Sequence, residues 1–235
     1  MDGAKTSESR PFFIVGCGRS GTTLLREMLN AHPNLGTPPE CPFLIAYLKD
    51  AGLSPKKAAA WLANEPFIRD WKMNISAKDF AECDNVTEVV DRLHKLYLQN
   101  THGKRWGQKT PKFVRHLPLL KERFPAAQVI HVIRDGRSVA ASYMRATWGP
   151  TNAYSAARYW KWNVLCGLRF SRHFPDQCLT IRYESLVEDP EGTLRDVLAF
   201  LNEPFDERVL QYEKHTDAIL PSVTVKQFDM LGKPM

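Results

Sequence analysis

The stretch "IVGCGRSGTT", residues 14–23, decides how this chain folds and what it binds. An apolar run enters a glycine-rich turn and leaves through two threonines into a leucine-rich segment with helical spacing. Gly16, Gly18 and Gly21 let backbone N–H groups turn toward phosphate oxygens, and the N-terminus of the following helix adds partial positive charge. The spacing is that of a P-loop, but Thr22 stands where ATP- and GTP-binding loops carry lysine. The stretch predicts a loop for one terminal phosphate, without a triphosphate or a metal. Read alone, it also fits a strand-turn-helix junction whose glycines serve only packing.

Beyond the loop, expected strands alternate with expected helices, which predicts an α/β fold: a three-layer, P-loop-like parallel sheet flanked by helices. The strands are expected at 11–15, 126–135 and 177–186, with a short strand-to-loop element at 106–111. The helices are expected at 22–31, 112–124, 136–145, 153–173 and 189–202. The proline-rich segment "LGTPPECPF", 35–43, is expected to be a stiff loop. Gly16, Lys109, Arg134 and Tyr183 each fall at or just past the end of a strand. The carboxyl ends of parallel strands share one edge, so these residues are expected to converge.

Residues 46–103 are expected to form a helical insertion, broken at Pro55 and Pro66, with a capping-box-like start at Asn85 and Glu88. Residues 1–10 are expected to be a disordered lead, and residues 11–235 a single domain. The chain contains no internal repeat and no low-complexity segment.

The overall composition is that of an ordinary globular protein: 235 residues, 43% hydrophobic and 25% charged, with a net charge of +6. This modest positive charge suits an anionic ligand and does not argue for nucleic acid. The five cysteines form no CxxC pair, which speaks against a zinc site or redox motif and favours reduced thiols. No signal peptide or transmembrane run is visible, so a cytoplasmic location is expected. The oligomeric state cannot be read from the sequence.

Three segments resemble the sulfotransferases that use 3′-phosphoadenosine 5′-phosphosulfate (PAPS). "IVGCGRSGTTLLREMLNAHPNL" is similar to their phosphosulfate-binding loop, above all in the protein-tyrosine sulfotransferase branch and in bacterial enzymes. "VIHVIRDGRSVAASY", 129–143, resembles their 3′-phosphate segment, and "LTIRYESLVEDPEGTLRDVLAFLNEP", 179–204, resembles a third segment. The likeness covers roughly 11–45 and 104–204 and leaves the middle of the chain unmatched.

The resemblance implies PAPS as co-substrate, adenosine 3′,5′-bisphosphate as product, and no metal. It implies that the cofactor is held by Gly18, Arg19, Ser20, Gly21, Thr22, Thr23, Arg134, Ser142, Tyr183 and Lys233. Two of these have a simpler interpretation: Arg134 could pair with the neighbouring Asp135, and Tyr183 could be a core tyrosine. Lys233 matches a "KP" lysine, and the basic segment that follows it in the family is absent here.

Three residues are the candidates for catalysis. Glu40 lies eight residues after His32, as the catalytic glutamate does in the tyrosine-sulfotransferase branch, and is the expected general base. Lys109 in "GQKTPKF" matches the family's "NKDPF"-like lysine, and Arg19 supplies a second cation. The simpler interpretations are a loop carboxylate that faces water and an exposed lysine.

Other bases and other functions remain open at this level. His102 is the reserve base, whereas His131 lies mid-strand and is expected to be a core histidine. Pro39 replaces an acidic residue of the tyrosine-sulfotransferase branch, which speaks against tyrosyl-protein substrates. The expected acceptor is a small molecule, a glycan or a peptide. A P-loop kinase or NTPase is disfavoured by Thr22 and by the lack of an acidic strand end for Mg²⁺. A non-catalytic, bisphosphate-binding descendant is disfavoured by the presence of Glu40 and Lys109.

Overall fold

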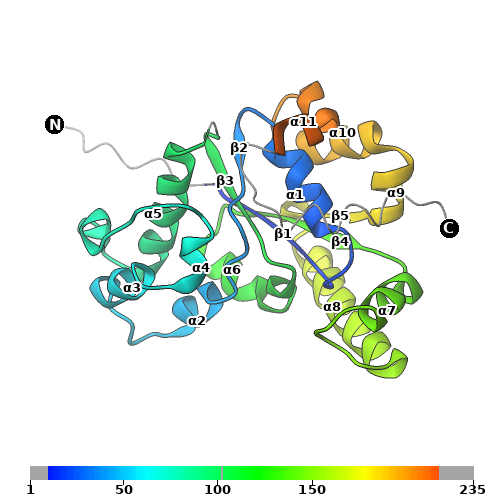
Figure 1. Cartoon of the computed structure of the whole chain (residues 1–235), viewed down its shortest axis with the longest axis horizontal. Helices are drawn as coiled ribbons and strands as arrows, with labels where there is room; N and C mark the ends of the chain where they lie inside the picture. The colour runs from blue at the N-terminus through cyan, green and yellow to red at the C-terminus, as the bar shows by residue number, and fades with distance from the viewer. Residues whose placement is uncertain (1–9, 102, 217–235) are drawn as a thin grey trace.

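The computed structural model describes residues 10–101 and 103–216, which build a five-stranded parallel sheet with helices on both faces (Figure 1). The strand order is β2-β3-β1-β4-β5. The strands are β1 (Phe12–Gly16), β2 (Leu35–Gly36), β3 (Arg105–Lys109), β4 (Gln128–Ile133) and β5 (Cys178–Arg182). The predicted α/β class is confirmed.

The central strand β1 explains the three layers. All five of its residues are buried, and successive side chains of a strand point to opposite faces. Phe13 and Val15 pack into one apolar core, and Phe12 and Ile14 into another. The second core holds α1 (Thr22–Asn30), α9 (Tyr183–Glu188), α10 (Pro190–Leu201) and the 3-10 turn η4 (Glu207–Gln211). Near η4 lies α11 (Glu213–Thr216).

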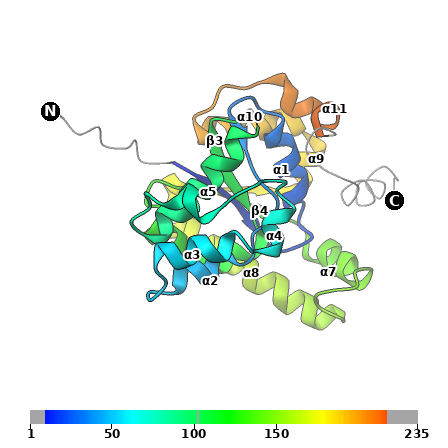
Figure 2. The ribbon, with the colours of Figure 1, turned by 60° about the vertical axis from the view of Figure 1, so that its left-hand side comes forward.

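The first core joins the sheet to the long helical segment between β2 and β3. It takes in α2 (Leu44–Lys49), α3 (Pro55–Leu62), α4 (Pro66–Arg69), η1 (Ala77–Phe80), α5 (Val86–Gln99), η2 (Pro111–His116) and α6 (Leu117–Arg123). In Figures 1 and 2 the helices α2–α5 gather on one side of the molecule, away from α7 (Gly136–Met144) and α8 (Ala153–His173). We refer to residues 44–99 as the helical region.

The expected breaks at Pro55 and Pro66 are helix starts. Each proline occupies the first turn of its helix, α3 or α4, where its missing N–H costs no hydrogen bond. Asn85 caps α5 through a hydrogen bond from the Glu88 amide (3.0 Å). The capping-box-like start therefore exists, although the Glu88 carboxylate accepts from the amide of Asp84 (2.7 Å).

Three expected boundaries were wrong. The loop expected at 35–43 contains β2, whose two residues pair with Arg105 and Trp106 of β3. The helix expected over 112–124 is the 3-10 turn η2 followed by α6, because Pro118 lacks an amide donor and is tolerated only in the first turn of α6. The strand expected to reach residue 186 ends at Arg182, and Tyr183 begins α9 rather than a loop.

Candidate active site

The glycine loop ends β1 and leads into the uncapped N-terminus of α1. At Gly16 a side chain would collide with the Val132 carbonyl oxygen on β4. Gly21 is the N-cap of α1, with a φ of 87°, no side-chain cap and no acidic residue in the first turn. The first amide groups of a helix lack internal partners, so this end of α1 is open to an anion. The Ser20 hydroxyl is also buried without a hydrogen-bond partner in the described part of the chain.

Tyr183 and Arg134 lie directly against this loop. A side chain at Gly21 would collide with the buried Tyr183 ring, so glycine is required for this close approach. The Arg134 guanidinium stacks over the same ring at 4.2 Å, and its Nη1 donates to the Arg19 carbonyl (3.2 Å). The ends of β4 and β5 are thereby joined to the loop, as the convergence of strand ends predicted.

The interpretation of Arg134 as the ion-pair partner of Asp135 is wrong. Asp135 instead pairs with Arg137 at 2.9 Å and accepts hydrogen bonds from the amides of Arg137 and Ser138, which cap α7. Within residues 10–101 and 103–216, no carboxylate forms an ion pair with Arg134. Its charge is therefore available to a ligand.

Arg19 reaches toward α7. Its Nε donates to the Ser142 hydroxyl (2.9 Å), and its guanidinium lies 5.9 Å from the ring centroid of Trp148. The structure thus brings together two residues that the sequence assigned to different phosphates. Trp148, which is 54% exposed, was missed by the sequence analysis, and the only local signal was a tryptophan in the turn "TWGP".

Lys109, Glu40 and Thr23 meet at the end of β3. The Lys109 ammonium donates to the Glu40 carboxylate and to the Thr23 hydroxyl, the latter over 3.2 Å. The Lys109 side chain is 3% exposed, whereas that of Glu40 is 45% exposed. Burial lowers the pKa of Lys109, and the charge of Glu40 opposes that shift. The interpretation of Lys109 as an exposed lysine is wrong. The carboxylate of Glu40 stands between this buried cation and the surface.

A buried glutamine fixes the segment that carries Glu40. Gln108 Nε2 donates to the Pro39 carbonyl (3.3 Å) and to the Thr110 hydroxyl (3.1 Å), and that hydroxyl accepts from the Cys41 amide (3.3 Å). Gln108 Oε1 lies 2.9 Å from Nε2 of His94, which is buried on α5. The residues on either side of Glu40 are therefore tied to β3. The sequence analysis missed Gln108, and its position next to Lys109 at a buried strand end was the available signal.

The structure decides the position of His131, which the sequence placed in the middle of a strand. His131 is fully buried in β4, and neither ring nitrogen has a partner among the described residues, which confirms a core histidine. Burial lowers its pKa to about 4. His102, the reserve base, and Lys233 lie outside the described residues.

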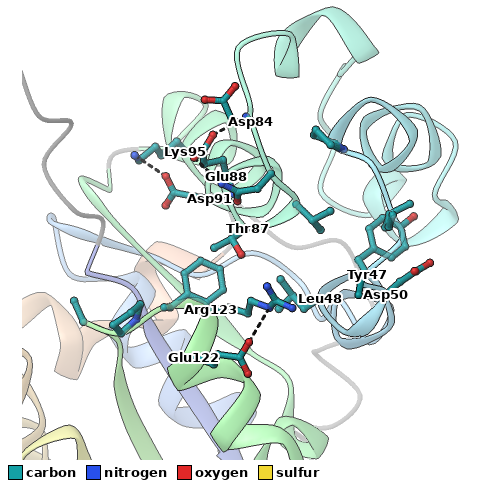
Figure 3. A pocket seen from close by; sticks show the side chains of 18 of the residues that line it. Tyr47, Leu48, Asp50, Asp84, Thr87, Glu88, Asp91, Lys95, Glu122 and Arg123 are labelled. Atoms are coloured by element: carbon teal, nitrogen blue, oxygen red, sulfur yellow. Dashed lines mark hydrogen bonds and ion pairs between the residues drawn. The ribbon is translucent and has the colours of Figure 1, made fainter. Parts of the chain in front are cut away.

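A large hollow on the helical region is of the opposite charge to the loop. It has a volume of about 890 Å³ and lies between α2, α5 and α6 (Figure 3). Its acidic side chains include Asp84, Glu88, Asp91 and Glu122, and Lys95 pairs with Asp91 at 2.6 Å. An acidic lining repels phosphate, so this hollow is not the partner of the glycine loop.

The described residues contain neither a metal-binding cluster nor a membrane-spanning helix. No group of three or more His, Cys, Asp or Glu side chains there is arranged to hold a metal ion. None of the helices in that part of the chain combines the length and apolar character needed to span a bilayer. Arg19, Lys109 and Arg134 are cationic side chains that lie in the loop or contact the loop or the helix that follows it.

These features define an α/β protein with an uncapped, anion-accepting glycine loop at the carboxyl edge of its sheet. The sequence model of the sulfotransferase family matches residues 11–207, and the chain belongs to that family. The resemblance seen in the sequence is thus confirmed at the level of the family.

Individual relatives agree with this assignment. The chain is 28% identical over 211 residues to protein-tyrosine sulfotransferase 1 of Danio rerio, a match covering 86% of this chain and 56% of the relative. It is 29% identical to an uncharacterised protein of Aquifex aeolicus over 97% of this chain and 30% of that protein. The chain therefore spans less than two thirds of these relatives.

Solved structures give the same fold. The sulfotransferase domain of the Synechococcus PCC 7002 olefin synthase is 27% identical, with a TM-score of 0.66 over 92% of this chain and 82% of that one. The sulfotransferase domain from the curacin biosynthetic pathway is 26% identical, with a TM-score of 0.63 over 87% and 77%.

Proposed function

We propose that this protein transfers a sulfuryl group from PAPS to the hydroxyl or amine of an acceptor. The observation that carries the proposal is the contact of Lys109 with both Glu40 and Thr23. It joins a partly exposed carboxylate, a buried cation and the start of the phosphate-loop helix. A general base and an electrostatic catalyst thus stand beside an anion-binding loop, as sulfuryl transfer requires.

The residues present fit PAPS. The uncapped start of α1 and the unpartnered Ser20 hydroxyl suit a 5′-phosphosulfate, which residues 18–23 would hold. Arg134, Ser142 and Tyr183 would hold the 3′-phosphate and the adenosine, and Lys233 stays a prediction from the resemblance. When bound, PAPS supplies the sulfuryl group and leaves as adenosine 3′,5′-bisphosphate.

Glu40, Lys109 and Arg19 have different roles in the proposed transfer. Glu40 accepts the proton of the attacking hydroxyl, because its carboxylate is the group of the cluster that reaches the surface. Lys109 stabilises the charge that develops on the departing phosphate oxygen, and its low exposure strengthens that interaction. Arg19, held by Ser142, adds a second cation at the loop. The stiff, hydrogen-bonded segment around Glu40 keeps the base in position for in-line attack.

Two measurements test the proposal. Calorimetry should detect binding of adenosine 3′,5′-bisphosphate, and ³⁵S from labelled PAPS should appear on at least one member of a panel of phenols, alcohols and amines. Glu40→Gln should keep the affinity for the bisphosphate and lower kcat by about 10²–10⁴-fold. Glu82→Gln, an exposed carboxylate of the helical region, is the matched control and should change neither.

The same experiment separates the alternatives. Binding of ATP–Mg²⁺ in preference to the bisphosphate would support a kinase or NTPase and would sink the proposal. Bisphosphate binding with no transfer to any acceptor would support a non-catalytic descendant. Full activity of Glu40→Gln would require another base.

A further inference from the structure

A second, smaller hollow lies at the junction of α2 and η2. Its volume is about 340 Å³, which is at the lower end of the range for small-molecule sites. Its walls are mainly apolar and are formed by Pro42, Ile45, Ala46 and Phe113. A compact hydrophobic group would find apolar contact on both sides, one from the α2 segment and the other from η2.

This hollow is adjacent to the proposed catalytic pair. Pro42, in one wall, lies two residues after Glu40, and Thr110, in the other, directly follows Lys109. Two residues of chain span about 7 Å at most. The Cys41 amide also donates to the Thr110 hydroxyl (3.3 Å), which ties the two walls together. A molecule in the hollow would therefore lie close to Glu40, although Glu40 does not itself line the hollow.

The rim of the hollow is cationic. Lys49 and Lys112 are exposed on it, and neither forms an ion pair with a carboxylate in the described part of the chain. His116, also on the rim, has its pKa lowered by burial and then by Lys49 and Arg115, and no carboxylate opposes that shift. The rim thus carries two lysines that no ion pair in the described residues neutralises.

The acidic hollow of Figure 3 makes the contrast clear. Both hollows border α2, yet the acidic one is lined by several carboxylates and has its own internal ion pair. An acceptor with negative charge would be repelled from that hollow and attracted to the rim beside Glu40.

We infer that the hollow between α2 and η2 is the acceptor subsite, and that it takes a small alcohol or phenol with a compact apolar body and a negatively charged group. The apolar body packs between Ile45 and Phe113. The anion faces Lys49 and Lys112, and the hydroxyl faces Glu40. This inference rests on the proposed function, because it assigns the substrate class of the same site.

The test uses two probes of equal size that differ in charge. The full chain, saturated with adenosine 3′,5′-bisphosphate, is titrated with 3-(4-hydroxyphenyl)propionate and with its neutral amide. The carboxylate should bind about tenfold more tightly than the amide, and Lys49→Gln/Lys112→Gln should remove this preference without changing the affinity for the amide. Lys56→Gln/Lys78→Gln makes the same change in net charge at exposed positions away from the rim and should keep the preference.

A further variant tests the apolar part. Ala46→Trp fills the hollow from its exposed wall and should weaken the binding of both probes at least tenfold while leaving the affinity for the bisphosphate unchanged. Equal affinity for the two probes, equal effects of the two double variants, or no binding of either probe at millimolar concentration would overturn the inference. Failure of the protein to bind the bisphosphate would instead overturn the proposed function.

Discussion

The carboxyl edge of the sheet and the helical region bury different kinds of side chain. At the sheet edge, Lys109 and Ser20 are polar and almost fully buried, and the Ser20 hydroxyl has no partner within the described ranges. The helical region buries mainly leucine, valine and aromatic side chains in the first core. Its buried His94 has both ring nitrogens in contact with oxygen atoms.

This difference assigns the chemistry to the sheet edge and much of the stability to the helical region. A buried polar group without full partners costs free energy, and at the sheet edge the proposed ligand would offset that cost. Apolar burial in the helical region stabilises the fold, and this region contributes to the site mainly through α2. Substitutions at the sheet edge should therefore change activity more than stability, and substitutions in the helical region should do the reverse.

The largest expected effect is that of Lys109→Met. Methionine keeps the length and removes the charge, so transfer should slow by about 10²–10³-fold, as when one donor to a developing anion is lost. The free energy of unfolding should change by less than about 1 kcal/mol, because the desolvation cost of the buried cation is removed and the remaining partner, Glu40, is 45% exposed and keeps its contact with water. Steady-state kinetics and urea unfolding measure the two quantities.

The matched control for this variant is Lys104→Met. Lys104 is exposed and stands just before β3, so its loss should leave both quantities unchanged. If Lys109→Met unfolds the protein while the surviving folded fraction keeps its activity, then the sheet edge serves stability and the contrast between the two regions is wrong.

A smaller effect is expected from His131, the buried imidazole of the sheet. Burial lowers its pKa to about 4, whereas an unfolded histidine titrates near 6.5. Between about pH 6.5 and pH 4 the His131 imidazole is protonated in the unfolded chain and neutral in the native state. Stability is therefore lost as pH falls toward 4, by about 3 kcal/mol, and is fully present above pH 6.5.

His131→Leu isolates this contribution. Because neither ring nitrogen has a partner among the described residues, leucine leaves no polar group unsatisfied. Urea unfolding between pH 7 and pH 4 should show a shallower decline for the variant than for the wild type. His94 and His116, whose pKa values are also lowered, contribute equally to both profiles. Parallel profiles would contradict the prediction.

The sequence predicted what depends on local pattern. The loop between β1 and α1 follows from an apolar run and glycine spacing, and the convergence of Lys109, Arg134 and Tyr183 follows from strand ends sharing one edge. What it could not predict depends on contacts between distant segments. The bond from Arg19 to Ser142 spans 123 residues, and that from Gln108 to Pro39 spans 69. Strand β2 was not predicted, because a strand of two residues near prolines is too short to show the alternation of apolar and polar side chains.

The smallest expected effect is at the start of α5, in the helical region. Asn85 accepts the Glu88 amide, so Asn85→Ala should lower the free energy of unfolding by about 1 kcal/mol. Asn85→Gly is the matched control and should cost only a few tenths of a kcal/mol, since glycine leaves the amide open to water. Neither variant should change kcat or the affinity for the bisphosphate, because the hydrogen bond from α5 to Gln108 comes from His94, more than two helical turns from Asn85. Asn85→Ala could lose more activity than folded protein. That result would mean that a change of packing in the helical region alters the position of Glu40, and that stability and chemistry are not separate in this molecule.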